Sequence, residues 1–69
     1  MPGRRWPTLS PREYDVALAI ARGRPNAEIA ADLLMSVATV KAHVTHILTK
    51  LDVTNRTQVA LLAHDAGLT

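Results

Sequence analysis

Cysteine and phenylalanine are absent from this chain of 69 residues, and aromatic residues make up only 3% of it. Without cysteine, neither a disulfide framework nor a thiolate zinc site can stabilise so small a domain. A chain of this length buries only about 60% of its unfolded surface, which excludes a doubly wound sheet, a barrel or a two-lobed enzyme. We therefore expect one small domain that is stabilised by tight helix packing and needs no cofactor.

Acidic residues are missing between Asp32 and Asp52, whereas Lys41 and Lys50 both lie in this stretch. The net charge of the whole chain is only +2, and this value alone does not indicate a nucleic-acid partner. No apolar run reaches the length of a membrane span or of the apolar part of a signal peptide. The sequence therefore predicts a soluble, cytoplasmic protein without a membrane partner, with a locally basic segment.

A complete set of start signals marks the first helix. Ser10 and Glu13 form a Ser-x-x-Glu capping box, Pro11 occupies the first helical position, and Gly23 follows the expected end near Arg22. In this position Glu13 is expected to cap the helix and to form a buried pair, not to act as a general acid or base. No serine or threonine has a base and an orienting acid beside it, so we expect no enzyme activity and no small-molecule substrate.

Three more helices are expected after the first. We predict that the second begins at the cap Asn26, that the third follows the cap Ser36, and that the fourth follows Asn55, with Gln58 completing a second capping box. Apolar residues recur on each helix with a period of about 3.6 residues, which is typical of a core-facing side. The expected core positions are Ile29, Ala30 and Leu33, then Val40, Val44, Ile47, Leu48 and Leu51, then Val59, Leu62, Ala63 and Ala66.

The resulting prediction is an all-α fold of four helices in residues 9–69, preceded by a linker or N-terminal arm in residues 1–8. The segment before the first helix contains prolines, a glycine and no apolar periodicity. Arg4 and Arg5 in this segment are expected to be part of a solvated linker, with an arm that reaches the minor groove of DNA as the alternative.

The short second helix, the tight turn and the long third helix form a helix-turn-helix pattern, which presents the third helix to the major groove of DNA. The outward side of this helix carries small residues such as Ala38, hydroxyl groups and the cation of Lys41. Small residues allow close approach to bases, and lysine can reach guanine. His43 and His46 are three residues apart, but with no cysteine or carboxylate nearby we expect no metal site there. We expect His43 to be partly buried and His46 to lie at the rim of the groove.

Residues distributed from the first helix to the fourth follow a recognisable family pattern. They are Leu9, Ser10, Pro11, Arg12, Glu13, Val16, Gly23, Asn26, Glu28, Ile29, Ala30, Leu33, Ser36, Thr39, Val40, Lys41, His43, Ile47, Lys50, Leu51 and Arg56. With this pattern, the region from Leu9 to Leu68 resembles the LuxR/NarL-type (GerE-like) helix-turn-helix domain of bacterial transcription and response regulators.

The resemblance implies sequence-specific binding of double-stranded DNA as the output domain of a transcriptional regulator. The third helix, about residues 37–51, would read the major groove, and the fourth, about residues 56–66, would pair two copies. RNA polymerase is a further candidate partner. The residues expected to face base edges are Lys41, Ala42 and Thr45, with His46 nearby. The expected phosphate-side or helix-end residues are Ser36, Thr39, His43, Lys50 and Arg56. The expected dimer contacts are Thr57, Leu61, His64 and Asp65.

The chain departs from the family pattern at three positions. Thr45 stands where many members have lysine or arginine, which removes one cationic contact. Leu34 stands at a turn position that is usually glycine, so either a left-handed leucine costs about 1 kcal/mol of strain or the turn has another shape. Leu18 stands at a usually polar position and is expected to be an exposed contact residue. The low net charge and Thr45 keep open an alternative function, a protein-interaction module on the same scaffold that does not bind DNA.

Overall fold

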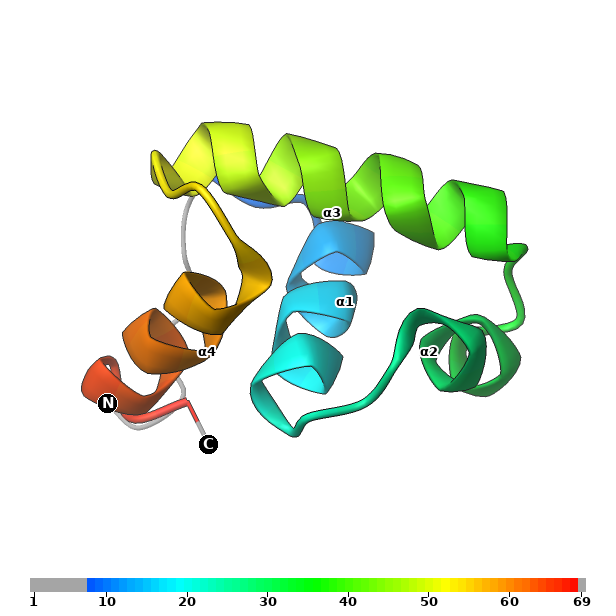
Figure 1. Cartoon of the computed structure of the whole chain (residues 1–69), viewed down its shortest axis with the longest axis horizontal. Coiled ribbons are helices and arrows are strands. Elements are labelled where there is room, and N and C mark those ends of the chain that lie inside the picture. The colour runs from blue at the N-terminus through cyan, green and yellow to red at the C-terminus, as the bar shows by residue number, and fades with distance from the viewer. Residues whose placement is uncertain (1–7, 69) are drawn as a thin grey trace.

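A computed structural model of the chain describes residues 8–68, and within this range it contains four α-helices and no strand. These are α1 (Pro11–Ala21), α2 (Asn26–Leu33), α3 (Val37–Leu51) and α4 (Arg56–Asp65) (Figure 1). The predicted all-α, four-helix class is confirmed. Most of the expected linker, including Arg4 and Arg5, lies outside the described residues.

Helix α1 lies at the centre of the domain, and the other three helices pack around it. Figure 1 shows α3 along the upper edge of the molecule, with α1, α2 and α4 all below it. The core contains fully buried aliphatic side chains from all four helices, and each one stabilises the fold by about 1.5–3 kcal/mol. The largest of them are Val16, Ile29, Val40, Ile47 and Val59.

The two predicted capping boxes have different outcomes. At α1 the box is complete, because the Ser10 hydroxyl accepts from the Glu13 N–H at 3.2 Å and the Glu13 carboxylate accepts from the Ser10 N–H at 2.9 Å. At α4 the Asn55 side chain accepts from the Gln58 N–H at 3.0 Å, as expected. However, the Gln58 side chain accepts from the N–H of Thr54 at 2.7 Å, one residue before the expected partner. The second box is therefore only half formed.

The prediction that Asn26 caps α2 is wrong. Pro25 is the cap residue, in extended conformation, and its carbonyl accepts from the N–H groups of Glu28 and Ile29, both at 3.0 Å. Asn26 is the first residue of the helix, and its side chain accepts a hydrogen bond from Arg56 of α4. The side chain that resembled a local cap therefore connects two helices.

Two expectations about exposure are also wrong. Ala66 is exposed because α4 ends at Asp65, and the chain then turns through Gly67, at φ 73°, to bury Leu68. Leu18 is half-buried rather than exposed, and it packs against the small cluster that Tyr14 forms with Ala63 and Leu68. The chain therefore closes the space between α1 and α4 with one residue from beyond the last helix.

The turns on either side of α3 share a left-handed backbone. Leu34, after α2, has φ 57° and ψ 45°, and Asp52, after α3, has φ 57° and ψ 48°. The Leu34 side chain is 92% exposed, so it gains no packing in return for the strained backbone. Of the two alternatives for this turn, the left-handed leucine is the observed one, with its cost of about 1 kcal/mol.

Candidate nucleic-acid interface

Helix α3 has one buried side and one open side. Val40 and Ile47 are 0% exposed, and they hold the helix against the core. The open side lies away from α1, α2 and α4 and contains no acidic residue anywhere along the helix. Its exposed residues include Ala38, Thr39, Lys41, Ala42, Thr45, His46, Thr49 and Lys50. The structure thus brings the expected base-facing residues together on one accessible side.

The hydroxyl groups on this open side already make hydrogen bonds within the protein. The Thr45 hydroxyl donates to the Lys41 carbonyl at 3.1 Å, and the Thr49 hydroxyl donates to the Thr45 carbonyl at 3.2 Å. At the start of the helix, the Ser36 hydroxyl accepts from the Thr39 N–H at 3.0 Å and donates to the Thr39 hydroxyl at 2.9 Å. Because its proton is used, the Thr45 hydroxyl presents acceptor lone pairs, not a donor.

The two lysines of α3 differ in their surroundings. Within residues 8–68, Lys41 makes no ion pair or hydrogen bond through its ammonium group. Lys50, by contrast, donates to Glu13 Oε1 at 2.7 Å, and the Glu13 side chain is only 7% exposed. Lys41 is therefore the available cation of this helix, and Lys50 is largely neutralised.

Glu13 connects the beginning of α1 with the last turns of α3. Besides Lys50 and the Ser10 N–H, the carboxylate approaches His46, whose Nδ1 atom lies 3.8 Å from Glu13 Oε2. The hydrogen bond from Lys50 lowers the pKa of Glu13, the bond from Ser10 adds to this effect, and burial opposes it. Glu13 is thus a buried anion beneath the proposed DNA-facing helix.

His43 is partly buried, as expected, and its Nδ1 atom is enclosed without a hydrogen-bond partner in the described part of the chain. The same part of the chain contains no group of three His, Cys, Asp or Glu side chains that could hold a metal ion. It also contains no helix long and apolar enough to cross a membrane.

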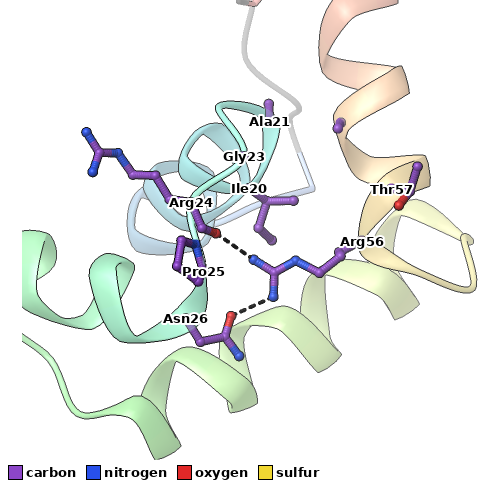
Figure 2. A pocket seen from close by; sticks show the side chains of 9 residues that line it. Ile20, Ala21, Gly23, Arg24, Pro25, Asn26, Arg56 and Thr57 are labelled. Carbon is purple, nitrogen blue, oxygen red and sulfur yellow. Dashed lines mark hydrogen bonds between the residues drawn. The ribbon is translucent and has the colours of Figure 1, made fainter.

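Arg56, another expected phosphate-side or helix-end residue, is half-buried and is held by bonds to other parts of the protein. Its guanidinium donates to Asn26 Oδ1 at 2.7 Å and to the Arg24 carbonyl at 2.9 Å. Figure 2 shows these two bonds, with Ile20 among the side chains drawn. These residues line a surface hollow of about 620 Å³ between the α1–α2 turn and α4. The bonds attach the start of α4 to the start of α2.

The four residues expected at a dimer contact are all exposed on α4, and Leu61 is 59% exposed. They lie on the side of the helix opposite the buried Val59 and Ala63. An exposed leucine of this kind is available for contact with another protein surface. The four residues are Thr57, Leu61, His64 and Asp65.

Two pairings of functional interest were not predicted from the sequence. The partner of Glu13 is 37 residues away, and that of Asn26 is 30 residues away, so no helical spacing rule connects them. Lys41, Ala42 and Thr45 could be predicted to share one side because they lie on a single regular helix.

The chain matches the family model described as "Bacterial regulatory proteins, luxR family" over residues 7–63. It is 47% identical over 57 residues to the transcriptional regulatory protein LiaR of Bacillus subtilis, a match that covers 83% of this chain and 27% of LiaR. It is 54% identical over 55 residues to the uncharacterized transcriptional regulatory protein YhcZ of B. subtilis, covering 80% of this chain and 26% of YhcZ. It is 43% identical over 60 residues to the response regulator protein VraR of Staphylococcus aureus, covering 87% of this chain and 29% of VraR. The chain thus spans between a quarter and a third of the length of these relatives, and it belongs to the luxR family of bacterial regulatory proteins.

Proposed function

We propose that this domain binds double-stranded DNA in a sequence-specific manner, as the output domain of a bacterial transcriptional regulator in the cytoplasm. The observation that carries the proposal is the open side of α3, where Lys41, unpaired within residues 8–68, lies among small and hydroxyl-bearing residues. A helix of this width fits the major groove of B-DNA. The names of the relatives, which include transcriptional regulatory proteins and a response regulator, support the same function.

In this proposal Lys41, Ala42 and Thr45 face base edges, and the nearby His46 lies at the rim of the groove, next to the phosphate backbone. Lys41 is the strongest candidate for a base contact because its ammonium has no ion pair in the described part of the chain and can reach guanine O6 or N7. Thr45 contributes a methyl group for a thymine contact and lone pairs that accept from adenine or cytosine amino groups. The residues proposed for the phosphate side or the helix ends are Ser36, Thr39, His43, Lys50 and Arg56. Of these, Lys50 and Arg56 are assigned the helix-end role, because their charged groups bond within the protein.

We further propose that two copies pair through the exposed side of α4 on inverted or direct half-sites. The exposed Leu61 supports this arrangement, with Thr57, His64 and Asp65 around it. Closed pairing of identical surfaces is the commonest form of oligomer in soluble proteins. RNA polymerase is a further proposed partner of the DNA-bound dimer.

A protein-interaction module without DNA binding is the second candidate. It is favoured by the internal bonds of Lys50 and Arg56, which leave fewer cations for phosphate than the sequence suggests. Fluorescence anisotropy with fragmented genomic DNA of mixed sequence, at low and at increasing salt, separates the two functions. We expect the logarithm of the binding constant to fall linearly with the logarithm of the salt concentration. A folded, dimeric sample without salt-sensitive binding would contradict DNA binding and favour the interaction module instead.

A further inference from the structure

The environment of His46 is unusual for a side chain on the open side of α3. The imidazole is 63% exposed, yet its Nδ1 atom lies 3.8 Å from the buried carboxylate of Glu13. At this distance the two groups attract each other only when the imidazole carries a proton. His46 therefore lies between a buried anion on one side and the proposed position of DNA on the other.

The two oxygens of Glu13 are not equally satisfied. Oε1 accepts from the Ser10 N–H at 2.9 Å and from Lys50 at 2.7 Å, whereas Oε2 has His46 as its ion-pair partner in the described part of the chain. A carboxylate accepts hydrogen bonds at both of its oxygens. The 3.8 Å between His46 Nδ1 and Oε2 is too long for a hydrogen bond, so the interaction is a charge attraction that a protonated ring has and a neutral ring lacks.

The charged groups around His46 act in opposite directions. Glu13, from α1, favours the protonated imidazole, while Lys50 and His43, on α3 itself, carry or can carry charge of the same sign. Within residues 8–68, no charged group of α2 or α4 forms an ion pair with His46. A DNA phosphate near the exposed edge of the ring adds a second anion, which shifts this balance toward the charged form.

We propose that the Glu13–His46 pair makes DNA binding by this domain proton-linked, with one proton taken up by His46 when a phosphate docks against α3. This inference rests on the proposed function. The imidazolium attracts the Glu13 carboxylate on its Nδ1 side and donates through its other ring nitrogen to a phosphate oxygen. A neutral imidazole has no net charge, so it loses the charge attraction to both anions. DNA affinity therefore rises as the pH falls through the range where histidine ordinarily gains its charge.

Anisotropy titration of a labelled random-sequence duplex at about pH 8 and about pH 6, at constant sodium concentration, tests the inference. We expect the wild-type domain to bind about threefold or more tightly at the lower pH. His46→Asn, which cannot be protonated, should bind with pH-independent affinity near the high-pH value of the wild type. His46→Lys is the matched variant that stays charged, and it should bind at high pH as tightly as at low pH.

Calorimetric titration in two buffers of different ionisation enthalpy provides a second readout, because proton uptake adds a buffer-dependent heat. We expect fractional proton uptake by the wild type near about pH 7 and none by His46→Asn. Equal wild-type affinity at both pH values, or a pH dependence that persists in His46→Asn, would overturn the inference while leaving DNA binding intact. Absence of salt-sensitive binding at every pH would overturn the proposed function itself.

Discussion

The two ends of α3 have similar backbones but different charge environments. A left-handed residue flanks each end, Leu34 before the helix and Asp52 after it. Near the start, Lys41 extends without an internal ion pair in the described part of the chain, whereas near the end Lys50 is bound to the buried Glu13. Two lysines on one helix therefore have different roles. The first is available to a ligand, and the second attaches the helix to α1.

This difference matters for estimating DNA affinity from a sequence. Counterion release depends on the cations that reach phosphate, not on the total number in a helix. Lys50 and Glu13 together carry no net charge, so the positive potential on the open side of α3 comes mainly from Lys41. Variants of these residues test whether the two lysines differ in this way.

The largest expected effect is on DNA binding through Lys41, near the start of α3. Lys41→Ala should weaken binding to a specific site by about 1–3 kcal/mol, because a lysine contact to guanine is lost. The measurement is the anisotropy affinity for a selected site and for random DNA. An equal loss on every sequence would assign Lys41 to phosphate and not to a base.

A double variant of Glu13 and Lys50, the ion pair near the end of α3, is the matched control. Replacing Glu13 and Lys50 together by glutamine removes two opposite charges, so the salt dependence of binding should stay within a fraction of one unit of the wild-type slope. A fall of about one unit would mean that Lys50 leaves Glu13 and reaches phosphate in the complex.

The next effect concerns the stability that the Glu13–Lys50 pair gives to the fold. Glu13→Gln should lower the free energy of unfolding by about 2 kcal/mol. The variant replaces the buried carboxylate by a neutral amide, so the ion pair with Lys50 is lost. Urea denaturation at neutral pH measures the change. Asp15→Asn on the same helix is the control, because its 3.5 Å pair with Arg12 is solvent-exposed and should contribute less than about 1 kcal/mol. Equal losses in both variants would contradict the special role of the buried pair.

Acid should remove the same stabilisation. The pKa of Glu13 is lowered in the folded protein, so its contribution is complete above the ordinary glutamate value of about 4.3 and is lost as the pH falls through the lowered value. The stability difference between the wild type and Glu13→Gln should therefore shrink as the pH falls from neutral toward about 3. Thermal unfolding of both proteins across this range tests the sign, and a constant difference would contradict it.

A smaller effect on stability is expected at the left-handed residues in the turns before and after α3. Leu34→Gly should raise the free energy of unfolding by about 1 kcal/mol, because glycine removes the left-handed strain and the exposed side chain makes no core contact that would be lost. Asp52→Gly should gain less, since aspartate tolerates this conformation better than leucine. Denaturant midpoints of the two variants give the comparison. A destabilised Leu34→Gly protein would mean that the leucine side chain contributes to the fold.

The smallest expected effect comes from restoring a cation on the open side. Thr45→Lys should steepen the salt dependence by about one unit, which corresponds to about a fourfold change in affinity between about 50 and 200 mM salt. The variant also removes the hydroxyl bond to the Lys41 carbonyl, so circular dichroism should confirm intact helicity. An unchanged slope would show that position 45 does not approach phosphate.

Local sequence signals predicted the helices and the open side of α3, because caps and apolar periodicity act over a few residues. Ser10 and Glu13 show this at α1, where both halves of the capping box formed as expected. The same reasoning failed at Asn26, because a long-range bond from Arg56 uses the side chain that looked like a cap. The contacts of Glu13 with Lys50 and His46 could not be predicted for a similar reason. Which distant side chains meet depends on how the helices pack, and short-range spacing does not encode that.

The complete capping box at Ser10 has a consequence for the path along which force travels through this domain. At the cap of α1, the Ser10 N–H is bound to Glu13, and Glu13 in turn holds Lys50 in the last turn of α3. A pull on the backbone at Ser10 therefore has a polar route to the proposed DNA-facing helix, through two hydrogen bonds and the side chains of Glu13 and Lys50, beside the route through the apolar core. The cap of the first helix and the helix proposed to meet DNA are mechanically linked, although they are far apart in the sequence.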